Sequence, residues 1–200
     1  MDKFEILRQQ LENLGSRKIL FILEGRDASG KGGFVKYLNA NDISYLYLHQ
    51  GRGTATRQKK WLSDYKKEIL SLPKGKLIIY DRSWHTRTWY HYPLGYCTKR
   101  QYQNQLRNVL KWEKKLESDY KIEIIKNWIS MTKKDQEKII ANRKIMKPEK
   151  YSESDGKAVE LFDQLTYTKE HMFVACPTWN IVDKYEAKEK LLEILIRETE

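Results

Sequence analysis

The chain has 200 residues, of which 32% are charged and 12% aromatic, with a formal net charge of +11 at pH 7. This length supports a full hydrophobic core, so we expect a single domain over residues 1–200. No apolar run approaches the roughly 20 residues that span a bilayer, and residues 1–15 lack the apolar core of a signal peptide. We therefore expect a cytoplasmic protein without membrane contact. The charge surplus is explained equally well by a polyanionic partner and by a solvated basic surface.

The first half of the chain alternates short apolar runs with longer amphipathic stretches. Residues 18–23 form a continuous apolar run between polar neighbours, which is typical of a strand covered on both faces. The apolar residues of 54–73 have helical spacing, and Pro73 ends that helix. In chain order we expect a helix at 1–15, a strand at 18–23, a helix at 34–40, a strand at 43–49, a helix at 54–73 and a strand at 76–81.

The same alternation continues in the second half. Thr98 and Thr132 precede amphipathic stretches, and threonine is a good N-cap. We expect a helix at 98–119, a strand at 120–130, a helix at 132–143, a strand at 178–183 and a helix at 186–198. Residues 143–157 are basic, polar and interrupted by Pro148 and Gly156, which indicates a loop or a mobile lid within a lid segment of about 143–172. Alternating strands and helices predict an α/β fold with a mostly parallel sheet of about five strands and helices on both faces.

A phosphate-binding loop is the clearest motif. Gly25, Gly30 and Lys31 satisfy G-x-x-x-x-G-K between a predicted strand and a predicted helix. Glycines let backbone N–H groups turn toward a phosphate, the helix start adds partial positive charge, and the lysine adds a full charge. The alternative is a structural turn. The candidate phosphate-binding or nucleotide-binding residues of this loop, besides the lysine, are Gly25, Arg26, Ala28, Ser29, Gly30, Gly32 and Gly33.

The loop lacks the hydroxyl that usually binds Mg²⁺ in such motifs, because Gly32 stands at that position. Asp27 lies within the loop and offers a carboxylate, a stronger ligand for Mg²⁺, although it is also a common turn residue. Asp81 ends the predicted strand 76–81, and an apolar strand that ends in aspartate has the form of a Walker B site. We therefore expect Asp27 and Asp81 to bind Mg²⁺.

Two arginines follow Asp81 closely in the sequence. Arg82 and Arg87 lie where the carboxyl ends of parallel strands form the ligand crevice. Arginines at such a position neutralise charge on a phosphoryl group during its transfer. As surface residues they would be unremarkable. We predict that Asp27, Lys31, Asp81, Arg82 and Arg87 form the catalytic set.

At this point the motifs resemble those of the polyphosphate kinase 2 family. The stretches "EGRDASGKGG", "YDRSWHTR", "LGYCT" and "KYSESD" occur in the same order, and in that family glycine also follows the lysine of the loop. The resemblance implies a P-loop kinase-like three-layer sandwich with a helical lid. It also implies that Asp27 and Asp81 share the Mg²⁺ ion, that Lys31 binds phosphate and that both arginines line the transfer site. It adds Arg52, Arg143 and Lys150 as phosphate-binding or nucleotide-binding residues.

The resemblance implies an enzyme that transfers phosphate between inorganic polyphosphate and a nucleotide, either AMP/ADP or GMP/GDP, and that forms a homo-oligomer. The chain departs from the family pattern at His85 and Thr86, where Tyr-Asn is usual, and the acceptor nucleotide stays open. One alternative is an ATP-dependent nucleoside monophosphate kinase of the thymidylate kinase type, against which the position of Gly32 argues. A second is a non-catalytic protein that binds a polyanion or nucleic acid.

Overall fold

A parallel sheet forms the centre of the protein. The computed structural model describes residues 2–51, 59–175 and 179–200. Within them the sheet has five strands in the order β2-β3-β1-β4-β5, and every neighbouring pair is parallel. The strands are β1 (Lys18–Gly25), β2 (Leu46–His49), β3 (Lys76–Asp81), β4 (Ile122–Ser130) and β5 (Trp179–Asp183). The fold class predicted from the sequence is confirmed.

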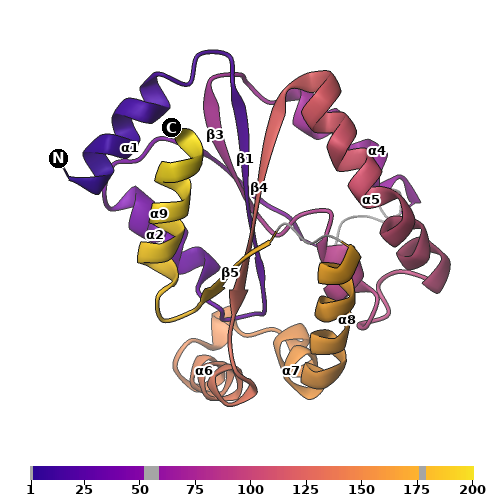
Figure 1. Ribbon diagram of the computed structural model, residues 1–200. Coiled ribbons are helices and arrows are strands. Elements are labelled where there is room, and N and C mark those ends of the chain that lie inside the picture. The colour runs from indigo at the N-terminus through magenta and orange to yellow at the C-terminus, as the bar shows by residue number, and fades with distance from the viewer. Residues whose placement is uncertain (1, 52–58, 176–178) are drawn as a thin grey trace.

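Helices cover both faces of the sheet (Figure 1). One layer contains α1 (Lys3–Glu12), α2 (Lys31–Asn39) and α9 (Ala187–Thr199), and the other contains α4 (Trp61–Ser71) and α5 (Lys99–Tyr120). The remaining helices lie toward the carboxyl ends of the strands: η1 (Arg87–His91), α6 (Lys133–Met146), η2 (Pro148–Lys150), α7 (Glu153–Glu160) and α8 (Phe162–Ala175). Within the described part of the chain, no helix combines the length and apolar character needed to cross a bilayer.

The central strand β1 explains the layered core. Its side chains alternate between the two faces, so that Ile19 and Phe21 join the cluster under α1, α2 and α9. Leu20 and Ile22 join the cluster under α4 and α5. Every residue of β1 is buried. Burial on both faces is why this strand reads as a continuous apolar run in the sequence.

The predicted elements exist, with shifted boundaries. Helix α2 begins at Lys31, earlier than expected, and β2 begins at Leu46, later than expected. Helix α4 begins at Trp61, and the first part of the expected helix 54–73 falls outside the described residues. Thr98 caps α5 as expected, because its hydroxyl accepts from the backbone N–H of Gln101 in a capping box.

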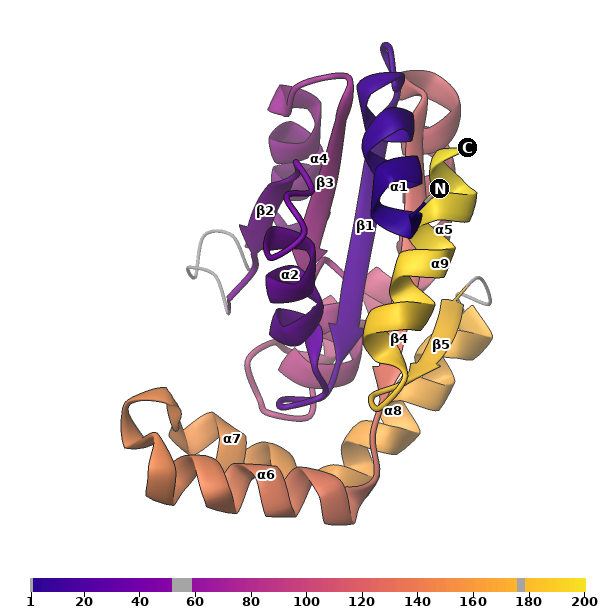
Figure 2. The ribbon, with the colours of Figure 1, turned by 90° about the vertical axis from the view of Figure 1, so that its left-hand side faces the viewer.

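Of the two alternatives expected for residues 143–157, a loop or a lid, the irregular loop is wrong, and the segment is helical as the family resemblance implied. Helix α6 continues to Met146 and α7 begins at Glu153, so that most of the segment is helical. An ion pair of 3.0 Å between Arg143 and Asp155 joins the two helices, and the Asp155 carboxylate also accepts from the Ser152 backbone N–H at 3.2 Å. The Ser152–Asp155 contact is a local capping box at the start of α7, whereas the Arg143–Asp155 pair links residues too far apart for a local pattern to indicate. Figure 2 shows α6 and α7 extending beneath the carboxyl ends of the strands; whether this helical segment moves stays a prediction.

Candidate functional site

A hollow of about 470 Å³ lies at the carboxyl ends of the central strands. It is bounded by the loop after β1, the end of β3 and the helical segment α6–η2. Much of the predicted site meets here. The lining residues are Asp27, Ala28, Ser29, Gly30, Lys31, Gly32, Gly33, Lys36, His49, Asp81, Arg82, Ile139, Arg143 and Lys150.

Two glycines of the loop cannot be replaced without rearrangement. Gly30 has a φ of 105° immediately before α2, and Gly25 has a φ of 138°. A Cβ atom on Gly25 would lie 2.5 Å from the carbonyl oxygen of Ile129 in β4. Both residues therefore need the conformational freedom of glycine. They let the chain leave β1 and enter α2, whose first residues Lys31, Gly32 and Gly33 line the hollow.

Lys31 is held inside the curve of this loop. Its Nζ donates hydrogen bonds of 2.8 Å to the Gly25 carbonyl and 2.9 Å to the Arg26 carbonyl. The side chain is buried, and burial lowers its pKa, while the negative charge of Asp81 acts in the opposite direction. A cation in this position strengthens the positive potential of the helix start.

Asp27 is tied to the turn that follows β3. Its carboxylate forms an ion pair with Arg82 and accepts a 3.0 Å hydrogen bond from the Tyr90 hydroxyl. Burial raises its pKa, but the positive charges of Arg82 and Lys31 outweigh that effect, and the pKa lies below its ordinary value. Asp27 is therefore ionised, with both carboxylate oxygens engaged by protein donors.

Asp81 has one free oxygen. Its Oδ2 accepts a 2.8 Å hydrogen bond from the Tyr47 hydroxyl and lies 3.3 Å from His49 Nδ1 on the neighbouring strand. Burial raises its pKa, but the contact with His49 and the charge of Lys31 lower it to about 2. The buried Oδ1 has no hydrogen-bond partner among the described residues. This oxygen is suited to accept a cation or a donor from a bound group.

The residues fit a Mg²⁺ ion that is shared with a substrate. Within residues 2–51, 59–175 and 179–200, no cluster of three or more His, Cys, Asp or Glu forms a complete metal site. Mg²⁺ usually needs only one or two carboxylates, because substrate phosphates and water supply its other ligands. The free oxygen of Asp81 satisfies that requirement, and Asp27 lies in the same hollow.

Arg82 points toward the hollow from a strained backbone. Its φ is 68°, its backbone N–H donates to the Leu23 carbonyl at 2.9 Å, and its guanidinium lies 4.3 Å from the centre of the Tyr90 ring. Arg143 and Lys150 line the hollow from the helical segment α6–η2, as predicted. Lys36 also lines it and was missed, although its position on the helix after the motif was a usable signal.

Within the described residues, Arg87 and Gly25 do not line this hollow. Arg87 is buried with its guanidinium 4.4 Å from the centre of the Trp61 ring, and burial lowers its pKa to about 10. Gly25 is present only as the turn that shapes the loop. Arg52 lies outside the described residues.

Arg26 turns away from the loop. Its Nε donates to the Gln136 side chain at 2.8 Å, and another nitrogen donates to the Ala158 carbonyl at 3.1 Å. Its guanidinium lies 3.5 Å from the centre of the Phe162 ring. The side chain therefore holds the loop to α6 and to the helices that follow it. This geometry does not place it among the phosphate contacts that the sequence predicted.

Glu24 is a structural residue of the site that sequence reasoning missed. It is fully buried and precedes the loop on β1. Its carboxylate accepts from the Ser83 backbone N–H at 2.7 Å, the Thr86 hydroxyl at 3.0 Å and the Trp89 indole N–H at 2.9 Å. These bonds clamp the turn that carries Arg82 and Arg87 onto the loop strand. A carboxylate inside an apolar strand run was the available signal, since buried charges need partners.

A buried cluster of charged residues around Glu113 supports the same turn from the side of α5 and β4. His85 lies 2.6 Å from Glu113 on α5, and Lys126 on β4 donates to the other Glu113 oxygen at 2.8 Å. The Trp84 indole donates to Glu113 as well, at 2.9 Å. Burial raises the Glu113 pKa, but the charges of His85 and Lys126 lower it to about 2. His85, one of the departures from the family pattern, thus has a specific partner.

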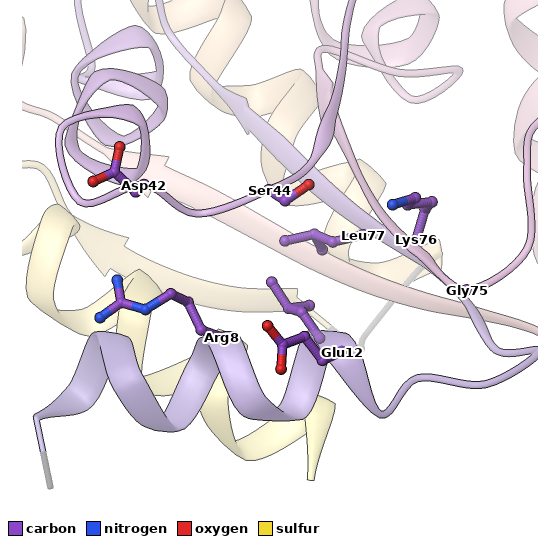
Figure 3. A pocket seen from close by; sticks show the side chains of 8 residues that line it. Arg8, Glu12, Asp42, Ser44, Gly75, Lys76 and Leu77 are labelled. Carbon is purple, nitrogen blue, oxygen red and sulfur yellow. The ribbon is translucent and has the colours of Figure 1, made fainter.

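A separate hollow of about 300 Å³ lies at the opposite end of the sheet (Figure 3). Its charged lining comes from Arg8 and Glu12 on α1, Asp42 after α2 and Lys76 at the start of β3. The guanidinium of Arg8 is already engaged, donating to the Asn41 carbonyl at 2.9 Å and pairing with Glu5 at 3.0 Å. None of the residues that line this hollow was predicted to be functional.

Comparison with known proteins gives a family match over nearly the whole chain. Residues 3–199 match the family described as Polyphosphate kinase 2. An NDP-polyphosphate phosphotransferase 2 from Ruegeria pomeroyi is 30% identical, over 96% of this chain and 58% of that protein. A GDP-polyphosphate phosphotransferase from Mycolicibacterium smegmatis is 28% identical, over 93% of this chain and 68% of that protein. The chain thus spans 58% of the length of the first relative and 68% of the length of the second.

Solved structures agree with the fold. A polyphosphate kinase 2 from Arthrobacter aurescens TC1 superposes with a TM-score of 0.82 at 18% identity, covering 98% of this chain and 76% of that chain. A deoxyadenosine kinase from M. mycoides, solved with bound dATP, superposes with a TM-score of 0.52 at 13% identity, covering 90% of this chain and 98% of that one. At these identities the likeness shows a P-loop kinase-like fold.

Proposed function

The chain belongs to the polyphosphate kinase 2 family, and on that premise we propose that it transfers a phosphoryl group between inorganic polyphosphate and a nucleotide with Mg²⁺. The observation that carries the proposal is the hollow in which buried Lys31, the free oxygen of Asp81 and the rim cations Arg143 and Lys150 converge. Phosphoryl transfer depends mainly on positioning and on charge stabilisation, which such an arrangement provides.

Each residue has a distinct part in the proposed reaction. Lys31 and the N–H groups at the start of α2 bind the phosphate oxygens, and Arg82 stabilises the charge that develops on the transferred group. Asp81 and Asp27 would hold Mg²⁺, and the bound ion would supply neutralisation of phosphate charge. Glu24 keeps the turn that carries Arg82 in register with the loop. No covalent intermediate with the protein is needed.

We propose a nucleoside diphosphate as the first acceptor to test. The relatives from R. pomeroyi and M. smegmatis are named for NDP and GDP. AMP and GMP remain alternatives from the sequence prediction. The cytoplasmic location, the single domain and the homo-oligomer expected from the sequence stay predictions.

An activity panel tests the proposal. The purified chain is incubated with Mg²⁺ and either polyphosphate or ATP as donor, and with ADP, GDP, AMP or GMP as acceptor. We expect product with polyphosphate and at least one diphosphate, and none when Mg²⁺ is chelated. Transfer from ATP to monophosphates alone would replace the proposal with the nucleoside monophosphate kinase alternative. Binding of polyanions without any transfer would favour the non-catalytic alternative.

A further inference from the structure

Helix α5 carries a stripe of cations on its solvent face. All of the cations in this stripe are exposed, and Gln103, Asn104 and Asn108 lie among them without adding charge. The stripe consists of Arg100, Arg107, Lys111, Lys114 and Lys115. From Arg100 to Lys115 it extends for about 22 Å, at 1.5 Å per residue.

The stripe lies opposite the face by which α5 packs on the sheet. The buried residues of this helix are Gln105, Val109, Glu113 and Leu116. Lys111 is two positions from Val109 and from Glu113, which is about 200° around a helix of 3.6 residues per turn. Arg107 has the same relation to Gln105 and Val109. The cations therefore project away from the core and play no part in packing the fold.

Within the described residues, the stripe has no ion pair like those of other surface helices, although Lys114 interacts electrostatically with Glu117 one turn along the helix. On α9, Lys190 pairs with Glu193 at 3.5 Å, and on α1, Arg8 pairs with Glu5 at 3.0 Å. On α5 the ion pairs that the structure describes are those of the buried Glu113. The acids Glu117 and Asp119 come only where the stripe ends.

The arrangement lowers the stability of the helix. Arg107, Lys111 and Lys115 follow one another at i, i+4 spacing, and like charges at that spacing repel. Like charges that repel along a helix without an ion pair to offset them are a locally unfavourable feature, and such features are expected at binding surfaces. The charge of the stripe indicates that its partner is a polyanion.

The neighbouring side chains favour a polyanion without bases. Proteins that bind single-stranded nucleic acid combine basic grooves with aromatic rings on which bases stack. Tyr102, the aromatic residue nearest the start of the stripe, stacks instead on Tyr92 with ring centres 4.3 Å apart. The exposed amides of Gln103 and Asn104 can donate hydrogen bonds to phosphate oxygens, whereas the Asn108 amide donates to Asn104. Within the described part of α5, the stripe thus offers charge and amide donors, and the exposed ring of Tyr120 lies past its end, beside Lys66.

We propose that the α5 stripe binds the distal part of a long polyphosphate chain whose end occupies the hollow, an inference that rests on the proposed function. Helix α5 begins beside η1, which follows the Arg82 turn, and runs from the carboxyl ends of the strands along the side of the sheet (Figure 1). A polymer long enough to leave the hollow can follow this helix. Tripolyphosphate, in contrast, is too short to engage both surfaces.

The test uses Arg107→Glu, with Lys188→Glu on α9 as a control of equal charge change. The new acid stands four residues before Lys111, an orientation that stabilises a helix, so the variant should fold. Lys188 lies in the first turn of α9, where an acid is also favourable. Affinities for long-chain polyphosphate, tripolyphosphate and a single-stranded oligonucleotide are measured by calorimetry at two salt concentrations. Turnover with tripolyphosphate is measured in parallel.

We expect Arg107→Glu to weaken long-chain binding about fivefold or more, the effect of one ion pair in water. The slope of log affinity against log salt should fall by about 0.7 or more, because the variant neutralises at least one phosphate fewer. Tripolyphosphate binding and turnover should not change, and Lys188→Glu should leave all values unaltered.

Equal losses in both variants, or no loss in Arg107→Glu, would overturn the stripe proposal. So would a loss confined to the oligonucleotide. A wild-type chain that binds long polyphosphate through the stripe but transfers no phosphate would instead overturn the proposed function alone.

Discussion

The two ends of the sheet both carry a hollow with charged walls, but they handle charge differently. At the amino end, the Arg8 guanidinium is paired with Glu5 and bound to a backbone carbonyl. At the carboxyl end, Lys31 donates to two carbonyls of its own loop and lies at the start of α2. A hollow with positive charge is therefore present at both ends of the sheet. The helix start and the buried, incompletely neutralised cation distinguish the carboxyl end.

The largest expected effect concerns the ion pairs at the two ends. Glu113 is buried against Lys126 behind the Arg82 turn, whereas Glu123 pairs with Arg17 near the amino end, with both side chains more than a third exposed. Breaking a buried pair typically costs about 3–5 kcal/mol, and breaking an exposed one about 0–1 kcal/mol. We therefore expect Glu113→Ala to be far less stable than Glu123→Ala in urea denaturation. Equal midpoints for the two variants would contradict this comparison.

The same pair predicts a pH dependence. The Glu113 pKa is lowered from 4.5 to about 2 in the folded state. A carboxyl with a depressed folded pKa stabilises the protein above its unfolded pKa, and this contribution is lost as the pH falls through the folded value. We expect the wild-type chain to lose stability between about pH 4.5 and pH 2, and Glu113→Gln to lose less over that window. Urea midpoints at a series of pH values provide the measurement.

The next effect concerns the lysines of the two hollows. Lys31→Ala removes the buried cation of the loop and little packing, and the loss of one such group typically costs about 10²–10³ in rate. Lys76→Ala removes an exposed cation from the amino-end hollow and should leave the rate unchanged. Phosphoryl transfer from polyphosphate is the readout, with circular dichroism to verify the fold. Near-normal turnover in a folded Lys31→Ala protein would remove the basis of the phosphate site.

The smallest effect separates the two carboxylates within the carboxyl-end hollow. Asp81 has a free oxygen, whereas both oxygens of Asp27 are engaged by Arg82 and Tyr90. We expect Asp81→Asn to raise the Mg²⁺ concentration for half-maximal rate about tenfold, because an anionic ligand becomes neutral. Asp27→Asn should raise it less if Arg82 keeps its hold on that side chain. A Mg²⁺ titration of each variant decides, and a larger shift for Asp27→Asn would reverse the assignment of the principal ligand.

Local patterns in the sequence were sufficient to predict the strands and the loop that position the site. The strand at 18–23, the glycines around Lys31 and the aspartate that ends strand 76–81 are short-range features, and the structure has them in the expected elements. The threonine cap at Thr98 is equally local and was also predicted correctly. In each case the residues that determine the conformation are neighbours in the chain, so that their spacing alone carries the information.

Only the tertiary structure decided where the charged side chains point. Arg26 and Lys31 belong to one loop, yet Arg26 turns outward to Gln136 while Lys31 turns inward. Glu24 finds its donors on the Arg82 turn, more than fifty positions later in the sequence. The ion pair between Arg143 and Asp155 likewise joins two helices in a segment for which the local sequence left a loop and a lid open. A buried charge goes where a partner offsets its desolvation, and that partner is supplied by distant elements of the fold.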